Sequence, residues 1–190
     1  PILSLRNIKK KTIFIIEASS YQLEYSKIFK SKYAAILNLS PDHLERHKTL
    51  NKYIKAKFKL LKNQSRESLA FVNKNDLLIN KELKSKSFNS KIIKVNTKKK
   101  YNNFLKNIDN EYFISETNKE NLSFILEISK KLNLKNNLIS QTIKKFSGLK
   151  YRQQIIFKKN NLTVINDSKS TSFSSSIGLL KSNQNIYWIL

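Results

Sequence analysis

The chain has 190 residues, 39% of them hydrophobic, which is enough for one domain with a proper core or for one domain and part of another. It has no Cys, which excludes disulfides and thiolate metal sites, and no apolar run of the roughly 20 residues that a membrane span needs. The net charge of +24 is spread along the chain without a nucleic-acid motif, so it indicates a Lys- and Asn-rich compositional bias rather than a nucleic-acid partner.

The first apolar run covers residues 12–16 and is β-branched and short, which is typical of a buried strand in a parallel sheet. Glu17 would then lie at the carboxyl end of that strand, where open α/β sheets bind their ligands. The polar cluster that follows predicts a helix start, with Ser19 or Ser20 as the candidate N-cap.

A second apolar run, residues 33–39, predicts a neighbouring strand, and the turn after it carries Asp42 and His43. Both strand ends belong to the same edge of a parallel sheet. We therefore expect His43 and Glu17 to be close enough to share one crevice. His47 is expected to lie at the surface.

The helix predicted from Leu50 contains one unexpected residue. Its apolar positions repeat at i, i+3 and i+4, and Lys57 falls within that apolar stripe rather than on the opposite, Lys-rich face. A lysine on a buried face loses basicity and becomes a reactive amine. The alternative is that Lys57 lies at the edge of the stripe and extends to water, and the pattern alone favours that alternative.

Three short apolar runs, residues 69–72, 92–95 and 112–114, predict further strands, and residues 76–83 predict a short helix between the first two. Helical spacing returns from Glu116 to Leu132. Asn118 and Asn121 lie three residues apart and so share one face near the start of that helix.

Gly148 follows a further predicted helix, residues 138–146, and suits its C-cap, and Arg152 starts the next strand. A guanidinium is suited to bidentate phosphate contact. The strand predicted over residues 162–165 runs into Asp167, Lys169 and Thr171 at a helix start, which is an anion-binding position.

These stretches together resemble the Mur ligases, and among them the members that add D-glutamate. The residues that carry the resemblance are EASSYQLEYSKIFKSKYAAILNLSPDHLERHKTLNKYIKAKFKLLKNQ, the Asn pair in TNKEN, GLKYR and NDSKSTS. The resemblance covers nearly the whole chain. It implies an α/β fold with a mostly parallel sheet flanked by helices, the family's central ATPase domain, over residues 1–147, and the start of a Rossmann-like C-terminal domain over residues 148–190.

The resemblance also implies a metal site. The family holds magnesium with a glutamate at a strand end, the histidine of a DH motif and a carbamylated lysine, and the matching positions are Glu17, His43 and Lys57. A carbamate is an anionic oxygen ligand suited to a hard cation. These three residues are therefore the expected catalytic and metal-binding groups.

For ATP, the resemblance places Asn118 and Asn121 on the adenine, Asp167 on the ribose, and Arg152 and Lys169 on the phosphates. Thr117 stands where the family has a histidine, which weakens the match at that position. The substrate contacts implied by the resemblance are Ser19, Gln22 and Thr171, the first two for the muramoyl group and the third for D-glutamate.

The implied reaction is ATP-dependent amide formation between UDP-N-acetylmuramoyl-L-alanine and D-glutamate through an acyl phosphate, by a cytoplasmic monomer. Two alternatives remain open. The first is a related amide ligase, either the diaminopimelate- or lysine-adding enzyme or folylpolyglutamate synthase, against which the NDSK motif argues. The second is a basic nucleic-acid-binding protein, which a steeply salt-dependent affinity for DNA or RNA would support.

The chain has only two Gly, and no G-x-x-x-x-G-K-[ST] phosphate loop is present, although the family has one upstream of the position of Glu17. The chain also contains no Met. We therefore expect the chain to be a fragment of a longer protein and to be inactive alone.

Overall fold

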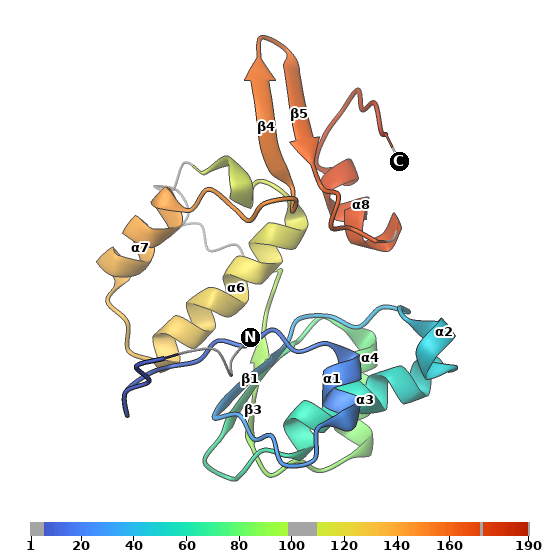
Figure 1. The fold of residues 1–190 in the computed structure, drawn as a ribbon, viewed down its shortest axis with the longest axis vertical. Helices are drawn as coiled ribbons and strands as arrows, with labels where there is room; N and C mark the ends of the chain where they lie inside the picture. Colours follow the sequence, from blue (N-terminus) through green and yellow to red (C-terminus); the bar gives the residue numbers. More distant parts are fainter. Residues whose placement is uncertain (1–5, 99–109, 172, 190) are drawn as a thin grey trace.

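The computed structural model describes residues 6–98, 110–171 and 173–189 (Figure 1). A parallel three-stranded sheet with its helices is followed by two long helices, then by an antiparallel hairpin and a last helix. In chain order the elements are α1 (Ser20–Tyr25), β1 (Tyr33–Ile36), α2 (Leu44–His47), α3 (Leu50–Lys62), β2 (Leu69–Asn73), α4 (Leu77–Ser85), β3 (Lys91–Val95), the 3₁₀ helix η2 (Glu111–Phe113), α6 (Glu116–Lys131), α7 (Asn136–Lys145), β4 (Gln154–Lys159), β5 (Leu162–Asn166) and α8 (Phe173–Lys181).

The sheet has the order β1-β2-β3, with all strands parallel. Its two faces are buried under different helices because successive side chains of a strand alternate between faces. Ala70 and Val72 of β2 belong to the core formed with α3 and α4, whereas Phe71 packs with Phe124 of α6 on the other face. The predicted α/β fold with a parallel sheet is confirmed.

Helix α3 forms as its periodicity predicts. Thr49 caps its start, with its hydroxyl accepting from the Lys52 backbone N–H at 3.2 Å. The apolar stripe is buried against the sheet and includes Tyr53, Ile54, Phe58 and Leu61. Burial of this stripe, more than helix propensity, stabilises the helix.

One carboxylate fixes the carboxyl edge of the sheet. Oδ1 of Asp76 caps α4 by accepting from the Ile79 backbone N–H at 2.9 Å, and its Oδ2 accepts from the Leu39 backbone N–H at 2.8 Å. The loop after β1 is thereby tied to the turn after β2.

A second core lies between η2, α6 and α7, where Phe113, Leu122, Ile139 and Ile143 are buried. The chain leaves α7 through Gly148, whose φ of +83° favours glycine. A Cβ at this position would lie 2.7 Å from carbons of the Tyr112 ring, so the glycine is required on both counts.

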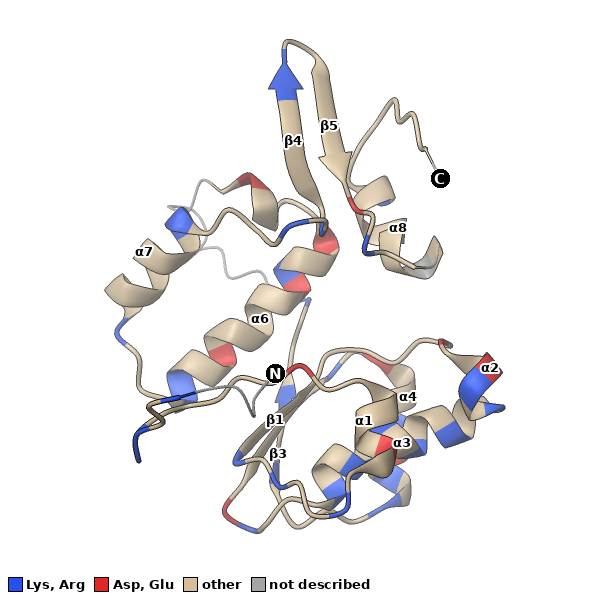
Figure 2. Cartoon of the chain, in the orientation of Figure 1, with Lys and Arg blue, Asp and Glu red and all other residues tan. Residues whose placement is uncertain are grey.

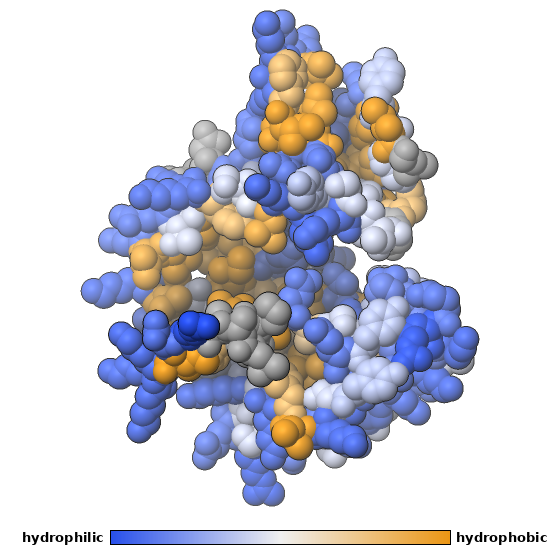
Figure 3. Space-filling model, in the orientation of Figure 1, coloured by the Kyte–Doolittle hydropathy of each residue, from blue (hydrophilic) through white to orange (hydrophobic). Residues whose placement is uncertain are grey.

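The hairpin β4–β5 and α8 form the last part of the chain, and α8 packs on α6. Their contact is close at one point, where a Cβ on Gly178 would lie 2.2 Å from Thr117 Oγ1. Much apolar surface remains exposed on the hairpin, including Ile156, Phe157 and Leu162 (Figure 3).

Two strand predictions are wrong. Residues 12–16 form no strand, and the Ile15 side chain is 98% exposed. A strand that is apolar on both faces needs a hydrogen-bonded neighbour and a layer on each face, and the described sheet provides neither for these residues. Residues 112–114 belong to the turn of η2 and the residue after it instead, since Asn110 Oδ1 accepts from the Tyr112 backbone N–H at 2.9 Å and turns the chain.

The Lys and Arg residues are distributed over most of the elements rather than gathered on one of them (Figure 2). The described helices include none that is long and apolar enough to cross a membrane.

Candidate nucleotide-binding and catalytic site

The linker from α7 to β4 brings together residues that are distant in sequence. Arg152 Nη2 lies 3.8 Å from Glu17 Oε1, and both side chains are exposed, that of Glu17 by 92%. The turn is held by the Arg152 backbone N–H, which donates to the Leu149 carbonyl at 3.2 Å. Arg152, placed by the sequence at the start of a strand, lies in this turn, two residues before β4 begins.

Next to Arg152, Gln153 joins the start of α6. Its Oε1 accepts from Ser115 Oγ at 2.7 Å and from Asn118 Nδ2 at 2.9 Å. Asn118 also donates to the Tyr112 carbonyl at 2.7 Å, and only 4% of the residue is exposed. Of the two asparagines predicted to contact adenine, Asn118 is thus tightly held, whereas Asn121 is half-buried and its side chain has no hydrogen bond to another described residue.

Asp167 binds the same linker from the end of β5. Its Oδ1 accepts from the Gln153 backbone N–H at 3.0 Å, and its Oδ2 accepts from the hydroxyls of Ser170 at 2.7 Å and Ser176 at 3.3 Å. The structure therefore brings Asn118, Arg152 and Asp167 to one place through a single pair of linker residues.

Lys169 and Thr171, the other two candidate site residues in the segment after β5, are exposed. The Lys169 backbone N–H donates to the Tyr151 carbonyl at 3.1 Å, so the segment is anchored while the Lys169 side chain is directed to solvent. Thr171 is exposed as well.

Tyr112 lies beneath this linker and packs edge-on against Phe113 and Phe146. Burial raises the pKa of its hydroxyl; the Arg152 charge acts in the opposite direction, and Asp167 raises the pKa further. The phenol therefore stays neutral at physiological pH.

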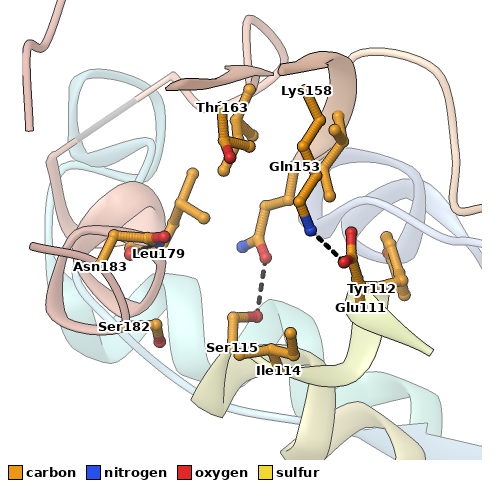
Figure 4. Close-up of a pocket in the computed structure, with 12 residues that line it drawn as sticks. Glu111, Tyr112, Ile114, Ser115, Gln153, Lys158, Thr163, Leu179, Ser182 and Asn183 are labelled. Carbon is orange, nitrogen blue, oxygen red and sulfur yellow. Dashed lines mark hydrogen bonds and ion pairs between the residues drawn. The ribbon is translucent and has the colours of Figure 1, made fainter. Parts of the chain in front are cut away.

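A cavity of about 140 Å³ lies between η2, the hairpin and α8, beside this network (Figure 4). An ion pair between Lys158 and Glu111 borders it, and the amide nitrogen of Gln153 points into it (Figure 4). Its volume is below the roughly 300 Å³ of a typical ligand pocket, so it accommodates a few water molecules rather than a nucleotide.

The second group of predicted residues lies around α1 and α2. Ser19 and Gln22 form a capping box, in which Ser19 Oγ accepts from the Gln22 N–H at 3.2 Å and Gln22 Oε1 accepts from the Ser19 N–H at 2.8 Å. Both side chains are exposed. The predicted capped helix start is confirmed, and substrate contact by these side chains stays a prediction.

His43 has a left-handed backbone, with φ of 54°, at the start of α2. Its Nε2 lies 3.5 Å from Asp42 Oδ2, its Nδ1 lies 3.8 Å from Glu45 Oε1, and its ring contacts that of Tyr21. In the described part of the chain no hydrogen bond or ion pair joins His43 to Glu17, which instead pairs with Arg152.

His47 is buried, contrary to our expectation of a surface residue. Only 2% of it is exposed, its Nε2 lies within hydrogen-bond distance of Ser20 Oγ at 2.9 Å, and its ring stacks on Tyr21 and meets Tyr53 edge-on. The physical reason is that α1 packs on α3 and covers the position.

Lys57 is half-buried, and its Nζ lies 5.0 Å from the centre of the Tyr53 ring. This is the geometry of a cation–π contact. The position thus lies between the two sequence interpretations, inside the helix stripe but not sealed from water.

The described residues contain no cluster of three or more His, Cys, Asp and Glu side chains that could hold a metal ion. The predicted ligand set has only two such groups, Glu17 and His43, and its third member would become an oxygen ligand only as a Lys57 carbamate. The donor types suit a hard divalent cation, so the metal role stays a prediction.

Sequence reasoning missed Gln153, Tyr112 and Ser115. A local signal existed for Ser115, because a serine three residues before Asn118 at the start of a periodic segment is an N-cap pattern. Gln153 and Tyr112 had none, since their roles depend on contacts between distant segments.

Comparison with known proteins shows to which family the chain belongs. Residues 2–144 match the family model described as the Mur ligase middle domain. The chain belongs to the Mur ligase family. Arg152, Gln153 and Asp167 therefore lie past the matched part of the chain, whereas Asn118 and the parallel sheet lie within it.

Similar curated proteins include three enzymes named UDP-N-acetylmuramoylalanine–D-glutamate ligase. The one from Rickettsia prowazekii is 30% identical over 93% of this chain, that from Alkaliphilus oremlandii 34% over 87%, and that from Clostridioides difficile 31% over 94%. The chain spans about two fifths of the length of these relatives, with 43%, 40% and 43% of each covered.

Proposed function

We propose that this Mur ligase chain is part of an ATP-dependent ligase that adds D-glutamate to UDP-N-acetylmuramoyl-L-alanine in peptidoglycan precursor synthesis. The observation that carries the proposal is the meeting of Asn118, Arg152 and Asp167 at the linker, because these residues come from three motifs of that ligase. The names of the relatives support the same acceptor.

In this proposal ATP phosphorylates the terminal carboxylate of the UDP-linked substrate, the amine of D-glutamate attacks the acyl phosphate, and phosphate leaves. Asn118 and Asn121 contact adenine, Asp167 the ribose, and Arg152 and Lys169 the phosphates. Cationic groups that reach the transferring phosphoryl group stabilise its charge.

Ser19 and Gln22 contact the muramoyl substrate, and Thr171 contacts D-glutamate. Glu17, His43 and a Lys57 carbamate would hold magnesium, which when bound neutralises phosphate charge. The half-buried position of Lys57, within the apolar stripe of α3, supports this role.

The residue range 148–190 is proposed as the start of the C-terminal domain, and 1–147 as the central domain. We further propose a cytoplasmic, monomeric enzyme. Because a G-x-x-x-x-G-K-[ST] loop is absent from the chain, ATP turnover is expected only from the full-length protein.

The test is ligation of D-glutamate by the full-length protein, with wild type, Lys57→Ala and the control Lys55→Ala, each with and without bicarbonate. Lys55 is exposed on the same helix. Loss of ligation in Lys57→Ala alone, at least about 100-fold, supports the proposal. Full activity of Lys57→Ala removes the carbamate role, and ligation of another amino acid by wild type replaces D-glutamate as the acceptor.

A further inference from the structure

Gln153 is the one linker residue whose side chain and backbone both bind predicted nucleotide contacts. Its Oε1 accepts from Ser115 and Asn118 at the start of α6, and its backbone N–H donates to Asp167 at the end of β5. Gln153 thereby fixes the position of Asn118, in α6, relative to Asp167, which follows β5.

The orientation of this network follows from hydrogen-bond chemistry. The Tyr112 carbonyl can only accept, so the group of Asn118 that faces it at 2.7 Å must be the amide nitrogen. That nitrogen also faces Gln153 at 2.9 Å, which makes the Gln153 atom there the oxygen. Both Asn118 N–H groups are then in use, and its Oδ1 has no partner among the described residues.

The backbone conformation of Gln153 also indicates that its side chain has a specific role. Its φ of +47° is a left-handed conformation that favours glycine. A glutamine there adopts a conformation that residues with a Cβ avoid, and it contributes the acceptor that a glycine would lack.

We propose that Gln153 is a positioning residue for the nucleotide, a role that rests on the proposed function. Through its side chain it fixes Asn118 so that only Oδ1 is presented, an acceptor that matches the exocyclic amine of adenine and not the oxo group of guanine. Through its backbone N–H it orients the Asp167 carboxylate toward the ribose.

The test uses the full-length protein as wild type, Gln153→Met, Gln153→Glu and Gln154→Met. Methionine keeps the length of the side chain but cannot accept these bonds, whereas glutamate keeps the accepting oxygen. Gln154 is the matched control, because its Oε1 accepts from the Tyr151 N–H in the same turn and its side chain has no hydrogen bond to Asn118 or Asp167 in the described part of the chain. ADP affinity is measured by calorimetry, kcat and KM for ATP and for GTP by ligation, and folding by Tm.

We expect Gln153→Met to raise the Kd for ADP and the KM for ATP about tenfold, with kcat within about twofold and a smaller preference for ATP over GTP. Gln153→Glu should recover most of the affinity, and Gln154→Met should match wild type. Measuring below the lowest Tm keeps every variant folded.

Unchanged ADP affinity in Gln153→Met, an equal loss in Gln154→Met, or a loss confined to kcat would each overturn the positioning role. Failure of the proposed function is distinguishable, because it concerns wild type. Wild type that binds ADP but does not ligate D-glutamate leaves the role of Gln153 intact and removes the acceptor, whereas wild type that binds no ADP removes both.

Discussion

Glu17 Oε1 lies 3.8 Å from Arg152 Nη2, so a carboxylate from before α1 meets a guanidinium from the linker after α7. Both side chains are exposed, Glu17 by 92% and Arg152 by 46%, and an exposed ion pair contributes little to stability because water and salt screen it. Because folding depends so little on this pair, the Glu17 carboxylate and the Arg152 guanidinium can bind a ligand instead of each other.

Replacing either member of this pair should separate activity from stability. Glu17→Gln and Arg152→Lys should each lower ligation by the full-length protein at least about 100-fold, because each removes a group proposed to act on phosphate or metal. Tm should stay within about 2 °C of wild type. Glu67→Gln, at another exposed glutamate, should change neither quantity, and wild-type ligation by Glu17→Gln would exclude Glu17 from the site.

The two histidines should behave in opposite ways. His47→Ala removes a buried ring that contacts Ser20, Tyr21 and Tyr53, and should destabilise by about 2–3 kcal/mol, lowering Tm by about 5–10 °C. His43→Ala removes a half-exposed ring and should leave Tm nearly unchanged while lowering ligation. Thermal unfolding followed by circular dichroism measures the difference, and equal Tm losses would contradict it.

Gly148→Ala should be strongly destabilising. The new Cβ would lie 2.7 Å from the Tyr112 ring, and the alanine would have to adopt a backbone φ of +83°. Together the clash and the backbone strain should cost about 2 kcal/mol or more. In a Tyr112→Ala background the same change should cost less, because only the backbone strain remains. Asn160→Ala, at an exposed position with φ of 51°, provides a control for strain without a clash. Additive losses measured by urea unfolding would rule out the ring contact.

Glu120 should make stability depend on pH. Burial raises the pKa of this carboxyl above its ordinary value, Glu116 and Asp76 raise it further, and Lys98 lowers it. A group with a raised folded-state pKa contributes stability that is present below the unfolded-state pKa and is lost as the pH rises through the folded-state pKa.

Glu120→Gln should therefore raise Tm at pH 7 by about 1–3 °C, and the gain should disappear below about pH 4. Tm values measured from pH 3 to pH 8, with Glu67→Gln as the control, test this. A gain of the same size at pH 3 would show that the effect is not electrostatic.

Local patterns predicted the elements that local interactions form. Helix α3 follows from its apolar spacing and Thr49 cap, and β2 follows from a short apolar run that is buried on both faces. Residues 12–16 have an equally apolar run but form no strand, because a strand also depends on a neighbour that sequence spacing does not reveal.

The candidate site was selected by the resemblance of its motifs to those of a family. That resemblance selected Asn118, Arg152 and Asp167, which the structure brings together around the linker. The burial of His47 and the contacts of Gln153 were not predictable, since each arises where segments distant in sequence pack together.

The close approach of Gly178 to Thr117 couples the sizes of two side chains. Thr117 stands where the family resemblance expects histidine, and no Cβ fits at position 178 while the Thr117 hydroxyl lies 2.2 Å from where it would be. A larger residue at position 117 would force α8 away from α6, together with Ser176 and its bond to Asp167. In relatives of this chain, the residue at position 178 should therefore vary together with the residue at position 117, as one inherited pair.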